Sequence, residues 1–140
     1  MDMRDITETT QITPSAGVTR DRHGWRAKCL QRLVRMDLPV PLSFALPCET
    51  VSAIAAGRHL RLDALRHVFE AGSGLVSVRP SAVMPEWGGP GTVLNVGIND
   101  ALHARLCDGI GRAGADAIYL SFVHSYAINI ARLDPDMFAQ

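Results

Sequence analysis

Leu75–Asp100, LVSVRPSAVMPEWGGPGTVLNVGIND, is the stretch that decides the fold of this chain. It begins with a short apolar run that ends at Arg79, passes through a loop dense in glycine and proline, and leaves through a second apolar run that stops at Asn99 and Asp100. Short apolar runs bounded by turn residues are typical of β-strands. The sequence therefore predicts two strands joined by a loop, with a cation at the end of the first strand. Ligand-binding groups are often carried on such loops, so we look here first for a site.

Helical periodicity surrounds these strands. Apolar residues recur at helical spacing in the segments 25–36, 49–56, 60–71, 101–109 and 116–133. A short strand is predicted over 43–46, and Asn99 is expected to cap the helix that follows it. Glycines at 109, 111 and 114 are expected to break the chain before the last helix. The sequence therefore predicts a mixed α+β domain with a small sheet and several packing helices.

Two of these helices have distinctive faces. In the segment 25–36, opened by Gly24, the expected apolar face consists of Cys29, Leu30, Leu33 and Val34, with Gln31 among the polar residues of the other side. The segment 116–133 is apolar around most of its circumference, which is typical of a helix that is buried or covered by a partner. Pro135 is expected to end it, with no further element in the C-terminus.

Composition and charge exclude several classes of function. The 140 residues suit one domain with its own core, and 14 basic residues balance 14 acidic ones. This balance gives no electrostatic reason to expect nucleic acid or an anionic membrane as a partner. Three cysteines without metal-ligand spacing, no long apolar run and no signal-peptide core predict a cytoplasmic protein with reduced thiols. Residues 1–20 are polar and rich in threonine, so they are expected to form a mobile arm ahead of a domain over 21–140.

Motifs that identify catalytic or metal sites are missing from the sequence, which contains no HExxH, GxSxG, Walker loop or GxGxxG. We therefore predict no catalytic residue and no metal ligand. Two basic features are candidates for an anion site. Gly24 precedes a helix that carries Arg26 and Lys28, and helix N-termini attract phosphate, although a glycine before a solvated basic helix face explains the same pattern. Arg79 is placed either to bind phosphate through its planar fork or to pair with a surface carboxylate.

These residues belong to a pattern that resembles the N-terminal nucleotide-binding domain of pyruvate phosphate dikinase. That family reads roughly LLVSVRSGA, then a loop MPGMMD, then TVLNLGLND; Val76–Arg79 and Thr92–Asp100 fall on the two outer blocks without gaps. Upstream, His23–Ala27 and Leu38–Phe44 are similar to the family's LGGKG helix and its LPVPPGF segment. Phe122–Met137 resembles its helix with DSYRRF. The resemblance covers about residues 23 to 138.

The resemblance implies the first part of an ATP-grasp module. It implies ATP as ligand, with Mg²⁺ only as the nucleotide's companion, and it places Arg26 at the family's lysine position and Arg79 at its arginine position as contacts to the ATP phosphates. The residues that it implies beside the nucleotide are Gly24, Trp25, Trp87, Gly88, Gly89, Gly91 and Thr92.

This chain also departs from the family's pattern. Trp25 stands where the family has a glycine, and the second loop carries Trp87 and replaces an acidic residue with Gly91. The two indoles could stack on a base or fill the space of the nucleotide. The family's metal-binding acids and remaining ATP contacts lie in a second half of the module that has no counterpart here. We therefore expect a truncated relative that is inactive alone and either binds ATP or ADP weakly or acts as an interaction module.

Two alternatives stay open at this point. One is half of a split ATP-dependent phosphotransferase, completed by a partner chain that docks on the apolar last helix. The other is a structural remnant that associates with itself through the same helix. Whether the chain takes part in an enzyme is left open by the sequence.

Overall fold

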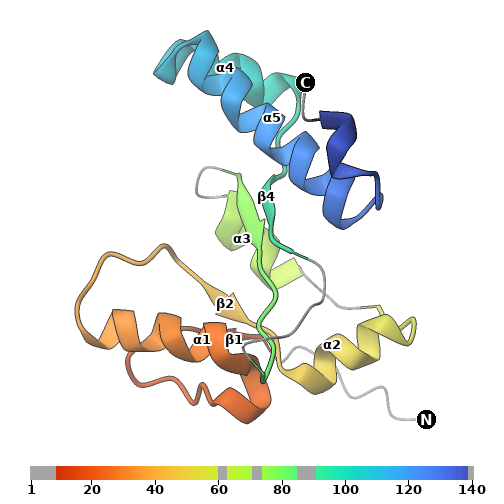
Figure 1. The fold of residues 1–140 in the computed structure, drawn as a ribbon. Helices are drawn as coiled ribbons and strands as arrows, with labels where there is room; N and C mark the ends of the chain where they lie inside the picture. The colour runs from red at the N-terminus through yellow and green to blue at the C-terminus, as the bar shows by residue number, and fades with distance from the viewer. Residues whose placement is uncertain (1–8, 60–62, 71–73, 85–90, 139–140) are drawn as a thin grey trace. The chain divides into compact units, whose positions relative to one another are not determined.

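The computed structural model describes residues 9–59, 63–70, 74–84 and 91–138 (Figure 1). The expected α+β class is confirmed, although the strands form two separate two-stranded antiparallel sheets rather than one. The elements in chain order are β1 (Thr10–Gln11), α1 (Arg20–Arg35), β2 (Phe44–Ala45), α2 (Cys48–Ala55), α3 (Asp63–Glu70), β3 (Val76–Val78), β4 (Val93–Val96), α4 (Asp100–Ile110), α5 (Arg112–Asn129) and the 3₁₀ helix η1 (Pro135–Phe138).

The chain divides into two compact units, which we describe one at a time. The N-terminal unit comprises Met1–Ala64 and Ser81–Gly88, and the C-terminal unit comprises Leu65–Pro80 and Gly89–Gln140. Among the described residues, no helix is both long and apolar enough to span a bilayer.

The segment that precedes α1 is part of the N-terminal core. β1 pairs with β2, with Thr10 opposite Ala45. Ile12 and Val18 are buried and pack with Ala27 and Ala45. The expectation of a mobile arm over residues 1–20 is therefore wrong for residues 10–19, because their two apolar side chains are enough to dock the segment on α1. Residues 1–8 lie outside the described part of the chain.

Polar side chains of α1 fasten this segment in place. The fully buried Gln31 donates through Nε2 to the carbonyl oxygens of Thr13 and Ala16, at 3.1 and 2.6 Å. The Nζ of Lys28 donates to the Val18 carbonyl and to the Gln31 Oε1, each at 3.0 Å. Backbone carbonyls of a segment without regular structure thereby gain the partners that burial demands.

The buried face of α1 differs from the predicted one. Ala27 and Gln31 are buried, whereas Leu33 is 40% exposed. Hydrophobic periodicity could not identify Gln31 as a core residue, because what makes its burial favourable is a set of carbonyls that come from elsewhere in the chain. The helix also begins at Arg20 rather than after Gly24, with Thr19 accepting at its N-cap from the Arg22 amide.

The remaining predictions in the N-terminal unit are close to the structure. β2 lies within the strand predicted over 43–46, and α2 matches the helix predicted over 49–56 within one residue at each end. Gly57, with φ of 87°, follows the end of α2, as expected for a helix stop that needs a left-handed residue.

The C-terminal unit is built on the β3–β4 pair and the α4–α5 hairpin. α3, predicted over 60–71, spans Asp63–Glu70, and this unit includes it from Leu65 onward. Val76 pairs with Val96, and Asn99 caps α4 by accepting from the Leu102 amide at 2.9 Å. Both features confirm the prediction of strand, loop, strand and capped helix. Of the three glycines expected to break the chain, only Gly111, with φ of 80°, separates α4 from α5.

The last helix differs from its prediction in position and in burial. α5 spans Arg112–Asn129 instead of 116–133, and the 3₁₀ helix η1 follows where no element was expected. Only small residues of α5, Ala115 and Ala127, are buried, while Leu120 is 68% exposed. Within the described chain, α5 therefore covers β4 with one side and leaves an apolar outer side exposed.

Candidate functional site

Gly24 interrupts α1 at the point where the sequence suggests an anion site. Its φ of 81° and ψ of 172° lie outside the helical region. A Cβ at this position would lie 1.7 Å from the backbone oxygen of Ser81. Only glycine can therefore provide both the backbone conformation and the close approach of the second segment.

The segment Ser81–Val83, which we call the 81–83 strap, occupies the start of the helix behind Gly24. The Trp25 amide donates to the Ala82 carbonyl at 2.7 Å, and the Ala27 amide donates to the Ser81 Oγ at 3.0 Å. The Ser81 hydroxyl in turn donates to the His23 carbonyl at 2.7 Å. Two backbone donors that a helix start offers to an anion are thus bound by the chain itself.

Trp25 has a partner on the same unit. The guanidinium of Arg20 lies 5.2 Å from the centre of the indole, and its Nε donates to the Val83 carbonyl at 3.0 Å. The indole remains 39% exposed. Trp25 therefore packs at the surface as half of a cation–π pair.

Arg26 and Arg79, the two residues expected to bind phosphate, are both exposed. Within the described part of the chain, neither side chain has a hydrogen bond or an ion pair. Arg26 belongs to the N-terminal unit and Arg79 to the C-terminal unit. The carboxylate pairing considered for Arg79 is not seen among the described residues.

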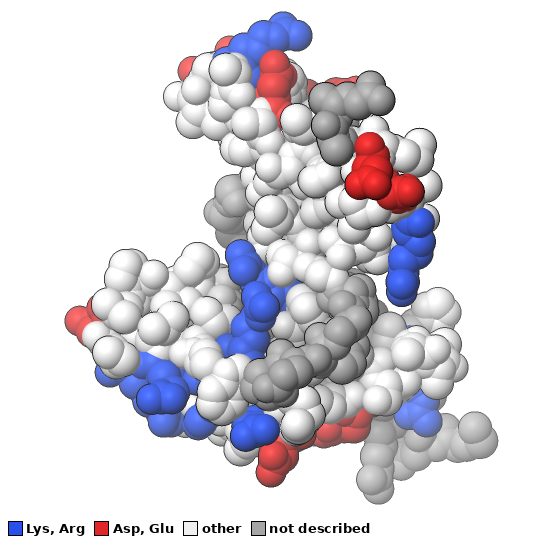
Figure 2. Space-filling view, viewed as in Figure 1, with Lys and Arg blue, Asp and Glu red and all other residues white. Residues whose placement is uncertain are grey.

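Further basic residues accompany Arg26 along α1. Arg22 forms an ion pair with Glu49 of α2 at 3.0 Å, whereas Arg35 donates to the Pro14 carbonyl. The space-filling view shows Lys and Arg side chains at several places on the N-terminal unit (Figure 2). The Glu49 amide at the start of α2, together with the Arg22 guanidinium, lowers the pKa of the Glu49 carboxyl.

The second loop is only partly described. Trp87, Gly88 and Gly89 lie outside the described residues. At the loop's end, the Gly91 amide donates to the Asn129 Oδ1 at 2.7 Å, and the Asn129 Nδ2 donates to the Thr92 carbonyl at 3.2 Å. A Cβ at Gly91 would lie 2.6 Å from the same Oδ1. These backbone groups therefore serve to attach the start of β4 to α5.

Sequence reasoning missed Asn129 and Ser125 as organising residues. The Ser125 Oγ accepts from the Leu94 amide at 3.0 Å, and the Asn129 Nδ2 also donates to the Ser125 carbonyl. Ser125 and Asn129 are four positions apart, so they lie on one side of the helix. That spacing was the available signal for a face that binds backbone.

His23 is also a buried polar residue that the sequence did not single out. Its side chain is 1% exposed, its Nδ1 accepts from the Thr19 amide at 3.3 Å, and its Nε2 lies 3.2 Å from the Thr10 Oγ1. This arrangement assigns the proton of the neutral ring to Nε2, which donates to Thr10. Burial, together with the charge of Arg22, lowers the pKa of His23.

The α4–α5 hairpin carries a cluster of chemically active groups. The His103 Nε2 lies 2.7 Å from the Asp116 Oδ1, and the Tyr119 hydroxyl donates to Asp100, which raises the pKa of Tyr119. The Cys107 Sγ lies 3.9 Å from both ring nitrogens of His103, so the sulfur faces the ring and is not aligned with one nitrogen. This geometry is unsuited to proton transfer from the thiol. Among the residues with a described placement, no three His, Cys, Asp or Glu side chains could share a metal ion.

The structure thus places the predicted residues in three situations. Gly24 and Trp25 are held by contacts within the N-terminal unit, Gly91 and Thr92 are attached to α5, and the side chains of Arg26 and Arg79 are unengaged within the described residues. Compared with known proteins, the chain matches no family model and no curated protein sequence.

Proposed function

We propose that this chain is a nucleotide-binding domain related to that of pyruvate phosphate dikinase, which binds ATP or ADP weakly. The guanidinium groups of Arg26 and Arg79 are each proposed as phosphate contacts because the resemblance places them at the family's lysine and arginine positions. The observation that carries the proposal is that both side chains are exposed and have no partner within the described residues. Arginine forms paired hydrogen bonds with phosphate oxygens, and a guanidinium without a competing carboxylate is free to do so. The ATP-grasp-like character of the fold is part of this proposal.

The contacts at the start of α1 support weak rather than tight binding in this proposal. The amides of Trp25 and Ala27 already donate to the 81–83 strap, so the helix start contributes less to a phosphate than an open glycine loop would. Phosphate recognition then depends on exposed guanidinium groups, whose charge is screened by solvent and salt. The proposal includes no phosphoryl transfer, and Mg²⁺ enters it only as an ion bound to the nucleotide.

Calorimetry with ATP and with ADP, each with and without Mg²⁺, tests the proposal. We expect dissociation constants between about 0.1 and 1 mM, equivalent to about −5.5 to −4 kcal/mol. Arg26→Gln and Arg79→Gln, made one at a time, should each weaken binding about tenfold, the loss expected for one charge-assisted contact. Arg105→Gln is the matched control, because Arg105 is an exposed arginine of α4 outside the proposed site.

The outcomes separate readily. Binding that the Arg105 variant reduces as much as the other two would show general charge attraction and contradict the assigned residues. No heat with about 5 mM of either nucleotide, in a chain that is folded by circular dichroism, would overturn the proposal.

A further inference from the structure

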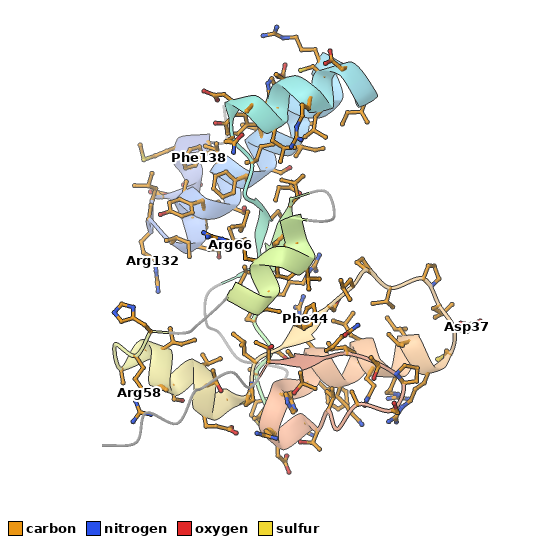
Figure 3. All side chains as sticks on the ribbon, turned by 180° about the vertical axis from the view of Figure 1, so that it is seen from behind. Asp37, Phe44, Arg58, Arg66, Arg132 and Phe138 are labelled. Atoms are coloured by element: carbon orange, nitrogen blue, oxygen red, sulfur yellow. The ribbon has the colours of Figure 1, made fainter. Side chains whose placement is uncertain are left out.

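The C-terminal unit exposes several large apolar side chains, which we call the outer face. It consists of side chains of α5, of the turn after it and of η1: Leu120, Val123, Ile130, Leu133, Met137 and Phe138. Leu120 and Met137 are each 68% exposed. The ring of Phe138 stands edge-on to His124 of α5, with 5.5 Å between ring centres, so η1 and α5 form one surface (Figure 3).

The outer face itself is uncharged, and charges are found only at its two ends. No Asp, Glu, Lys or Arg occurs from Ala117 to Ala131. Arg112 and Asp116 lie near the start of α5, while Arg132, Asp134 and Asp136 follow the end of the helix. All five are exposed, and the side chain of Arg132 extends away from α5 (Figure 3).

The charge of Arg112 opposes the dipole of α5. A helix favours acidic residues at its N-terminus and basic residues at its C-terminus. The first turn of α5 contains no acidic residue and its last turn no basic one. Within one chain, Arg112 forms a long ion pair with Asp116, with 3.7 Å between the Arg112 Nε and the Asp116 Oδ2. The Arg112 side chain is 84% exposed, so this pair compensates the unfavourable position of its charge only weakly. A second surface would compensate these charges better if it placed acidic residues beside the start of α5 and a basic residue beside its end.

We propose that the outer face binds the outer face of a second copy of this chain, with the two α5 helices antiparallel and related by a two-fold axis. Antiparallel pairing places Arg112 of each copy toward Asp134 and Asp136 of the other, and aligns the helix dipoles favourably. The uncharged centre then pairs with itself, so no charge is buried without a partner. A parallel pairing would instead place like charges together. A two-fold interface requires such a self-complementary surface.

Sedimentation velocity over a range of protein concentrations tests the pairing. The mass should rise with concentration from 15.2 kDa toward twice that value. Leu120→Glu should keep the chain monomeric at the highest concentration, with the circular dichroism of the parent, because Leu120 is exposed and the variant places two carboxylates in an apolar contact. Val51→Glu, at a 50% exposed position of α2, is the matched control and should associate like the parent.

Exchange of charges tests the antiparallel order. Arg112→Glu and Asp136→Arg should each weaken self-association, by about tenfold at low salt. An equimolar mixture of the two variants should recover association. Each mixed dimer keeps one end with its native pair of opposite charges, and at its other end the glutamate introduced in one variant faces the arginine introduced in the other. Recovery should diminish at about 0.5 M salt, where exposed charges are screened.

Three results would overturn the proposal. The first is a chain that stays monomeric at every concentration; a Leu120→Glu variant that is then less stable to urea would show that the outer face is covered within one chain. The second is association that Val51→Glu abolishes and Leu120→Glu does not. The third is a mixture of the charge variants that associates no better than either alone.

Discussion

At the scale of single residues, Gly24 is a position where the N-terminal unit has no room for a side chain. Replacement by alanine would combine a strained φ of 81° with a Cβ placed 1.7 Å from the Ser81 oxygen. We expect Gly24→Ala to lower the free energy of unfolding by about 3 kcal/mol or more, because the 81–83 strap must move and release the amides of Trp25 and Ala27. Urea unfolding followed by tryptophan fluorescence measures this loss.

Gly57 offers a matched control for that measurement. It has a similar φ of 87°, but a Cβ there would meet no atom within 4 Å. Gly57→Ala should therefore cost only the conformational strain, about 1 kcal/mol. Equal losses in the two variants would contradict the close approach of the strap.

The buried His23 gives the chain a stability that depends on pH. Since its pKa in the folded protein is lowered from 6.5, the unfolded chain binds more protons near that pH. The contribution of His23 is therefore complete above pH 6.5 and is lost as the pH falls through 6.5 toward the folded value. A proton on Nδ1 would also oppose the Thr19 amide that donates to it.

The test is a series of urea midpoints between about pH 5 and 8. The parent should lose stability on the acid side, and His23→Gln should reduce that slope while lowering stability at the alkaline end of the series. A parent whose midpoint rises on acidification would refute the assignment of a neutral buried imidazole.

At the scale of elements, Asn129 joins α5 to β4. Its side-chain amide bonds the Gly91 amide and the Thr92 carbonyl, and Asn129→Ala would leave both without these partners. We expect a loss of about 1–3 kcal/mol in the stability of the C-terminal unit. Arg105→Ala on the exposed side of α4 should change stability by less than about 0.5 kcal/mol. Chemical denaturation of the two variants checks the difference, and similar losses would contradict this role of Asn129.

The elements that the sequence predicted well are those defined by local signals. The Asn99 cap, the glycine after α2 and the two apolar runs around the glycine-rich loop each carry their information within a few residues. Docking of the segment before α1 could not be predicted in this way. It depends on Gln31, whose partners Thr13 and Ala16 are distant in sequence and offer only backbone atoms.

The candidate site shows the same division. Spacing and residue type identified Arg26 and Arg79 as candidate phosphate ligands and Gly24 as a special position; the structure shows that both arginines are exposed and that Gly24 needs a positive φ. The sequence could not predict that the 81–83 strap packs beside Gly24, because Ser81 and Ala82 belong to no pattern that indicates contact with the start of a distant helix. Sequence likewise predicted that α5 is apolar, but not which side β4 covers.

At the scale of the whole molecule, the division into two compact units predicts that a destabilising substitution in one unit increases hydrogen exchange in that unit alone. Hydrogen exchange should show faster exchange of the amides of α1 in Gly24→Ala and of β4 in Asn129→Ala, since each substitution breaks contacts inside one unit. Each variant should leave the other unit's amides close to their parent rates. Loss of protection across the entire chain in both variants would show that the units unfold as one.

Lys28 gives the chain a single side-chain amine. It is the only lysine in the sequence, and its Nζ is held by the Val18 carbonyl and Gln31. Reagents that acylate side-chain amines therefore have a single target. Acylation leaves only one N–H on Nζ, so it breaks at least one of these two hydrogen bonds, and we expect it to be faster when the segment before α1 is detached. The rate of acylation at Lys28 would therefore report how often this segment detaches, without any label having to be introduced.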